Sequence, residues 1–223
     1  MARKSPRAKP GIFPPAVALE DLIAGGFGAI AGGAAYAVLL PLPSGDGGAW
    51  VRGEQLPGWG AVFAWVLALV AYLGFGFFSA VLARVDHRTH TLPNGLLVWA
   101  TLWTLPLLTL AGQLRGDGVA GVGAWLVTGV ITLLCVLIWL RASGAIGAGD
   151  VKLIPLAAYA AAWGLAGPAA VNVSFVFLGL LLAGVLVLGV SALIRGTGEV
   201  AVGPIVLGAS WATFMVMRVP VGS

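Results

Sequence analysis

Long apolar runs with almost no charge recur along the chain and restrict it to one environment. A helix needs about 20 apolar residues to cross the hydrocarbon core of a bilayer. We read seven runs as spans, at residues 22–42, 60–83, 92–112, 119–140, 153–167, 168–194 and 200–217. The boundary between the fifth and sixth runs, at Gly167 and Pro168, is the least sharply marked. This pattern predicts a polytopic transmembrane helical bundle with about seven spans.

The composition supports this interpretation and argues against others. Of the 223 residues, 60% are hydrophobic and only 9% are charged, whereas soluble domains carry about 25% charged residues. Disordered chains need low hydrophobicity, and membrane β-strands would alternate apolar and polar residues, which these runs do not. The expected fold class is all-α. We expect a basic cytoplasmic tail at residues 1–15, followed by a single transmembrane domain at residues 16–223.

The basic residues predict the orientation, because Lys and Arg are enriched in cytoplasmic loops. With the N-terminus inside, the cytoplasmic segments hold Arg3, Lys4, Arg7, Lys9, Arg84, Arg88, Arg141, Lys152 and Arg195, and the outer segments hold Arg52, Arg115 and Arg218. We therefore expect the loops at 84–91, 141–152 and 195–199 to face the cytoplasm. Twelve scattered basic residues suit a lipid bilayer better than nucleic acid, so no nucleic-acid partner is expected.

Two carboxylates stand out from the other six by position. Glu20 and Asp21 precede the first run, where acids offset the helix macrodipole. Asp86 and Asp150 instead stand where an apolar run meets a predicted cytoplasmic turn, on the same membrane face. Ionisable residues at a membrane boundary are costly to retain and suggest function. A structural alternative exists for each: Asp150 would cap a helix beginning at Val151, and Asp86 would end a helix beside two arginines.

The segments around these two aspartates resemble a pair of family motifs. The first reads Asp86, Thr89, Leu92, Pro93 and Asn94, in the pattern D-x-x-T-x-x-(I/L)-P-(N/D). The second reads Gly147, Gly149, Asp150, Lys152 and Leu153, in the pattern G-x-G-D-x-K-(L/M). Together they resemble the signatures of the type IV prepilin peptidases, a GxGD class of intramembrane aspartyl proteases. A softer resemblance lies at residues 202–209, which are similar to a glycine-proline segment in the family's last helix.

The resemblance implies an activity and a site. It implies that Asp86 and Asp150 are the catalytic residues of an aspartic endopeptidase without a cofactor or a metal. Thr89, Leu92, Pro93, Asn94, Gly147, Gly149 and Lys152 would be motif residues that position the substrate or the aspartates. The implied substrates are prepilins or pseudopilins of a type IV pilus or a protein secretion system, cut at the cytoplasmic face of the inner membrane.

One departure from the larger family members concerns cysteine. Those members carry a cytoplasmic zinc-binding insert with two CxxC pairs, associated with N-methylation of the trimmed pilin. This chain has a single cysteine, Cys135, inside an apolar run. The resemblance is therefore to the compact, peptidase-only form, and methyltransferase activity is not expected.

Helix dipoles suggest roles for the two aspartates. Asp150 would start a helix, whose positive end favours a carboxylate, and Asp86 would end one, whose negative end favours a protonated acid. The hypothesis is that Asp150 is the resting base and Asp86 the resting acid. Lys152 would either orient this pair or extend its ammonium group to the lipid headgroups.

Two other functions remain open from the sequence. His87 and His90, three residues apart beside Asp86, could bind zinc together with Asp150, although no H-E-x-x-H motif is present. The alternative from a different class is a non-enzymatic membrane transporter or assembly subunit. Transporters tend to show inverted repeats and polar groups near the bilayer midplane, whereas these acids lie at the ends of the apolar runs.

Overall fold

The computed structural model describes residues 17–40, 58–116, 118–141, 148–165, 168–195 and 202–218. Within these ranges the regular secondary structure is entirely α-helical. The helices are α1 (Leu19–Leu39), α2 (Gly58–Thr89), α3 (Asn94–Leu114), α4 (Gly118–Arg141), α5 (Ala148–Ala162), α6 (Pro168–Arg195) and α7 (Gly203–Val216). The all-α class predicted from the sequence is confirmed for the described part of the chain.

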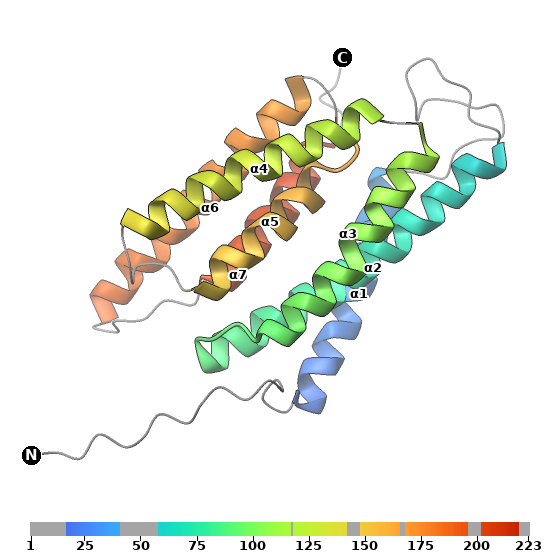
Figure 1. Ribbon diagram of the computed structural model, residues 1–223. Coiled ribbons are helices and arrows are strands. Elements are labelled where there is room, and N and C mark those ends of the chain that lie inside the picture. Colours follow the sequence, from blue (N-terminus) through green and yellow to red (C-terminus); the bar gives the residue numbers. More distant parts are fainter. Residues whose placement is uncertain are drawn as a thin grey trace, which may run out of the picture.

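The helices form two flanking groups with a central pair between them. Helices α1, α2 and α3 pack side by side as one group, and α4 packs on α6 in the other. Helix α5 contacts α3 on one side and α4 on the other, and α7 likewise joins α2 to α6 (Figure 1). The central pair, α5 and α7, is thus the junction of the bundle.

The outward faces of the bundle are apolar. Phe27 and Phe175, for example, are 71% and 73% exposed. Within the described part of the chain, five helical segments are long and apolar enough to cross a membrane: Leu19–Leu39, Trp59–Thr89, Asn94–Leu114, Gly121–Ile138 and Ala169–Val187. A surface of this kind is stable against lipid tails and unstable in water. The chain is therefore a helical membrane protein, while the expected seven spans and their orientation stay predictions.

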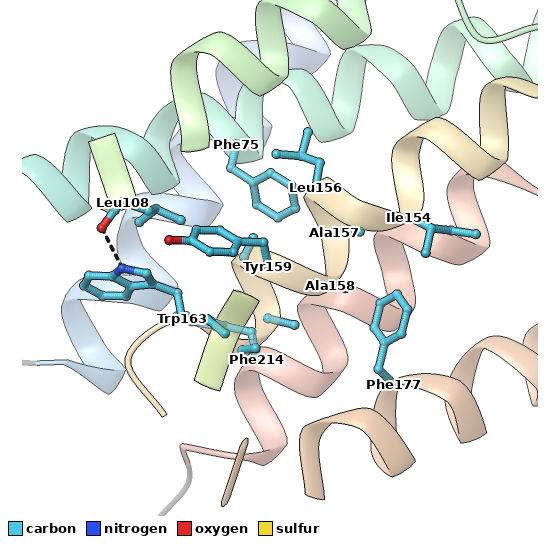
Figure 2. Packing of buried hydrophobic residues seen from close by; sticks show 14 of the residues in the cluster. Phe75, Leu108, Ile154, Leu156, Ala157, Ala158, Tyr159, Trp163, Phe177 and Phe214 are labelled. Carbon is cyan, nitrogen blue, oxygen red and sulfur yellow. Dashed lines mark hydrogen bonds between the residues drawn. The ribbon is translucent and has the colours of Figure 1, made fainter. Parts of the chain in front are cut away.

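Helix α5 is short and buried on nearly every side. Its 15 residues correspond to about 22 Å, less than the roughly 30 Å of a bilayer core. From Leu156 to Trp163 each side chain is at most 2% exposed, as expected for a helix that is apolar all round. Figure 2 shows Tyr159 and Trp163 among these residues, within the core between the flanking helices.

The position of Trp163 differs from a common expectation for tryptophan near a span end. Such residues often lie at the membrane interface, but Trp163 is only 2% exposed. Its indole N–H donates a hydrogen bond to the carbonyl oxygen of Leu108 over 2.7 Å (Figure 2). Gly164 follows with φ +77° and ends α5. A buried tryptophan needs a partner for its N–H, and the carbonyl in α3 supplies it.

Glycines allow α1 and α2 to lie in direct backbone contact. A Cβ on Gly28 would collide with the carbonyl oxygen of Gly76, and a Cβ on Gly76 with that of Gly28. A Cβ on Gly32, one turn along α1, would lie 2.6 Å from the carbonyl oxygen of Tyr72. This is the close approach that small residues at a four-residue spacing allow in membrane helices.

Two helix boundaries differ from those expected from hydropathy. The second apolar run was expected to end at residue 83, whereas α2 continues to Thr89. The fifth was expected at 153–167, whereas α5 spans 148–162. Both aspartates of interest therefore lie inside helices. Their helices continue past the apolar runs because polar side chains at the helix ends find partners on neighbouring helices.

Candidate active site

Asp86 lies in the last turns of α2 and faces the start of α7. Asp86 is buried, with only 4% of its surface exposed. The backbone N–H of Gly203, the first residue of α7, donates a hydrogen bond to Asp86 Oδ2 over 3.1 Å. The first N–H groups of a helix have no acceptor within the helix, so this donor is available to a carboxylate.

Asp150 lies in the first turn of α5, as its third residue. It is 8% exposed, so this acid is also buried. A carboxylate in the first turn of a helix is stabilised by the helix dipole. Gly149 lies within the same turn, while Gly147 falls outside the described residues.

Leu92 connects the surroundings of the two aspartates. A Cβ built on Gly149 would lie 2.8 Å from Leu92 Cβ and 3.5 Å from Leu92 Cδ1. A Cβ built on Gly203 would lie 3.4 Å from the same Cδ1 atom. One methyl group of Leu92 thus separates the glycine before Asp150 from the glycine that donates to Asp86. The two motif segments meet at one end of the bundle, which we call the aspartate end.

Lys152 and Asn94 form a second link between the motifs. The ammonium group of Lys152 in α5 donates a hydrogen bond to Asn94 Oδ1 in α3 over 3.0 Å. Both residues are exposed. Pro93 immediately precedes α3 as its N-cap residue, with φ −67° and ψ 120°, which suits a proline. This hydrogen bond belongs to neither of the two roles expected for Lys152, since it ties the two motif segments together.

Thr89 is the last residue of α2 and belongs to the turn that follows it. Its hydroxyl group lies 2.7 Å from the carbonyl oxygen of Val85 and 3.0 Å from the hydroxyl oxygen of Thr91. His90, with φ +49°, then reverses the chain toward α3. Thr89 is exposed, and these hydrogen bonds are those of a residue that stabilises the helix end.

The structure differs from both structural alternatives that the sequence left open for the aspartates. Helix α5 begins at Ala148, so Asp150 is not the cap of a helix that starts at Val151. Arg84 and Arg88 form ion pairs with α1, whereas Asp86 accepts its hydrogen bond from α7. Residues 84 and 88 share one helix face, and residue 86 lies on another because successive helical positions are 100° apart.

Asp21 lies at the same end and has a role that was not expected from the sequence. It is completely buried and pairs with both Arg84 and Arg88, and it accepts the backbone N–H of Ala18 over 3.0 Å. From the sequence alone, Asp21 is expected only to offset the helix dipole. The four-residue spacing of the two arginines was the available signal, since antiparallel neighbours α1 and α2 bring Asp21 to the same end.

The helices that carry Asp86 and Asp150 are not the only ones whose ends lie at these two carboxyl groups. Helix α7 now adds a third terminus, since its first N–H donates directly to Asp86. Both carboxyl groups therefore meet the positive end of a helix, and the dipoles alone no longer distinguish a resting base from a resting acid.

The histidines lie at the edge of the same end. His87 and His90 are both exposed. Among the residues that the structure describes, no group of three His, Cys, Asp or Glu side chains is arranged to hold a metal ion. The zinc site considered from the sequence thus has no support in the geometry of the described side chains.

Comparisons with protein-family models, with curated proteins and with solved structures found no match to this chain.

Proposed function

We propose that the chain is an intramembrane aspartyl endopeptidase that removes the short basic leader of prepilin-like proteins. The observation that carries this proposal is the meeting of the two motif segments. Asp86 and Asp150 are 64 positions apart in sequence, yet the Leu92 methyl group lies against the glycine neighbours of both. Aspartyl chemistry requires two carboxyl groups that reach the same water molecule, and the meeting of the two motif segments at one end of the bundle supports such a pair.

The proposed reaction uses one ionised and one protonated carboxyl group. The ionised group takes a proton from a water molecule as the water oxygen adds to the scissile carbonyl carbon. The protonated group donates its proton to the carbonyl oxygen, which gives a neutral tetrahedral intermediate. Its collapse breaks the C–N bond: the amine leaves with a proton from the first carboxyl group, and the second, now ionised, takes the hydroxyl proton as the carbonyl bond re-forms. Neighbouring carboxyl groups share one proton because both cannot ionise readily.

The position of the aspartates fits a substrate that is partly in the membrane. They lie at helix ends, beside outward faces that are apolar. A prepilin-like substrate has a basic leader outside the bilayer and an apolar helix within it, so its cleavage site lies at the membrane boundary. The substrate carbonyls of a helix are hydrogen-bonded, so the substrate must unwind locally before water attacks.

Co-expression with prepilin-like proteins tests this function. The leader is expected to be lost with the wild-type protein, and Asp86→Asn and Asp150→Asn should each abolish the loss while the protein stays in the membrane. Glu20→Gln is the matched control, because Glu20 is an exposed carboxylate at the same end. This variant should cleave the substrate as the wild-type protein does. Full cleavage by either aspartate variant would refute the mechanism. Inhibition by a chelator would favour a metal site, and uncut substrates throughout would favour a transporter or assembly subunit.

We further propose that the aspartate end faces the cytoplasm in the inner membrane. In a Cys135→Ala background, a cysteine at Glu20 should react with an impermeant maleimide only in inverted vesicles. A cysteine at Trp59, which is 87% exposed near the other end of α2, should react from the outside of intact cells. The reverse labelling pattern would place the site on the other face of the membrane.

A further inference from the structure

The start of α7 lies against the carboxyl group of Asp86. The Gly203 N–H and Asp86 Oδ2 are 3.1 Å apart, in a buried contact between residues 117 positions apart in sequence. Pro204 follows in the first turn, a position that suits proline because no N–H is needed there. The next N–H groups, of Ile205 and Val206, bond to the carbonyl oxygen of Val202. The N–H of Gly203 is therefore the one that α7 presents to Asp86.

The space at this position is taken up by the carboxyl group of Asp86. A Cβ on Gly203 would lie 2.8 Å from Asp86 Oδ2 and 3.2 Å from its Cγ. It would also lie 3.4 Å from Leu92 Cδ1, so the carboxyl group has a packed neighbour on that side. Any side chain at position 203 must displace the carboxyl group that the hydrogen bond holds.

We infer that Gly203 is a positioning residue for Asp86: its N–H anchors Oδ2, and its lack of a side chain leaves room for the carboxyl group. This inference rests on the proposed peptidase function and adds a third helix to its site. An N–H donor to a carboxylate stabilises the charged form and fixes the orientation of the group. With Oδ2 anchored to α7, Oδ1 is the oxygen that exchanges a proton with water or substrate.

A glycine pair in α7 provides the first test. Gly203→Ala inserts a methyl group against Asp86, whereas Gly208→Ala in the same helix inserts one into open space. We expect Gly203→Ala to lower kcat by about tenfold or more, because the displaced carboxyl group of Asp86 loses its hydrogen bond to the backbone N–H. KM should change by less than about threefold. Gly208→Ala should match wild type. Equal kcat values for the two variants would overturn the inference.

A backbone substitution provides the second test and does not depend on cleavage. Installing glycolic acid at position 203 replaces the N–H with an ester oxygen and adds no atom, and an ester at position 208 is the control. In an Asp150→Asn background, infrared titration follows the Asp86 carboxyl group, with His87 and His90, which interact with it electrostatically, left in place. The ester at 203 should move the midpoint by about one pH unit or more, and the ester at 208 should not.

The two tests separate the possible failures. An unchanged Asp86 midpoint with the ester at 203 would refute the role of Gly203, even if the wild-type protein cleaves prepilins. If the wild-type protein cleaves none and the midpoint still moves only with the ester at 203, the peptidase proposal fails. The control of Asp86 by α7 then stands on its own.

Discussion

The ammonium group of Lys152 and the amide oxygen of Asn94 are joined by a 3.0 Å hydrogen bond, although the residues are 58 positions apart. The bond runs from the first turns of α5 to the first residue of α3. It fixes the Asp150 segment to the turn that follows Asp86. Because both partners are exposed, its contribution is modest, and its removal should alter alignment more than folding.

We predict that Lys152→Met slows leader cleavage by about three- to tenfold, the range expected for one ordinary hydrogen bond between exposed groups. Asn94→Ala should have a similar effect, and the double variant should be no slower than either single variant because all three lack the same bond. Initial cleavage rates in detergent provide the measurement. Arg141→Met, which removes another exposed cation from the end of α4, should leave the rate unchanged. A cleavage rate of the double variant that falls by the product of the two single effects would contradict the link.

Asp21→Asn should destabilise the contact between α1 and α2. The substitution removes the charge that pairs with Arg84 and Arg88, and the amide retains only part of the hydrogen bonding. Since both arginines are more than two-fifths exposed, solvent limits the loss to about 1–2 kcal/mol of unfolding free energy. Denaturant unfolding in detergent measures it. The neighbouring Glu20→Gln should cost less than about 0.5 kcal/mol because Glu20 is exposed; equal losses would show that Asp21 is not special.

Gly28→Ala should separate α1 from α2, because the new methyl group meets the carbonyl oxygen of Gly76 and backbone atoms cannot move aside cheaply. Overpacking of this kind costs about 1–3 kcal/mol. Gly26→Ala is the matched control, since its Cβ meets nothing within 4 Å and alanine favours a helix by up to about 1 kcal/mol. Thermal unfolding of the two variants in the same detergent should therefore move in opposite directions. A Gly28→Ala protein as stable as Gly26→Ala would argue against the close contact.

Hydropathy located a helix for each of the seven expected runs but misplaced the ends that matter most. It counts Arg84, Asp86 and Arg88 as loop residues because they are charged. In the folded chain the arginines pair with Asp21, and Asp86 bonds to Gly203, so the helix continues through them. Such pairing depends on which helices become neighbours, and apolar runs carry no such information.

The end of α5 shows a similar limit. Hydropathy predicts that the fifth run ends at residue 167 and that the sixth begins at Pro168. Helix α6 does begin at Pro168, but α5 already ends at Ala162, and Gly164 follows it in the left-handed conformation. Trp163 then lies in the core because the carbonyl oxygen of Leu108 is within reach of its N–H. The contact between Trp163 and Leu108 could not be inferred without knowing that α3 packs on α5.

The candidate site was predicted in part. Motif spacing selected Asp86, Leu92, Gly149 and Lys152, and the described residues do come together. The catalytic roles remain predictions, because contact is not chemistry. Gly203 entered the sequence analysis only within the softer resemblance at residues 202–209. Its hydrogen bond uses a backbone atom that every residue but proline has, so the letter code gave no direct sign of it.

The enclosure of α5 has a consequence for its place in the membrane. Fifteen residues that are covered by protein on nearly all sides have no stable position of their own across a bilayer. The segment therefore depends on the longer helices around it to stay in the membrane. Asp150, in the first turn of α5, is held in place by its neighbours rather than by an anchor of its own.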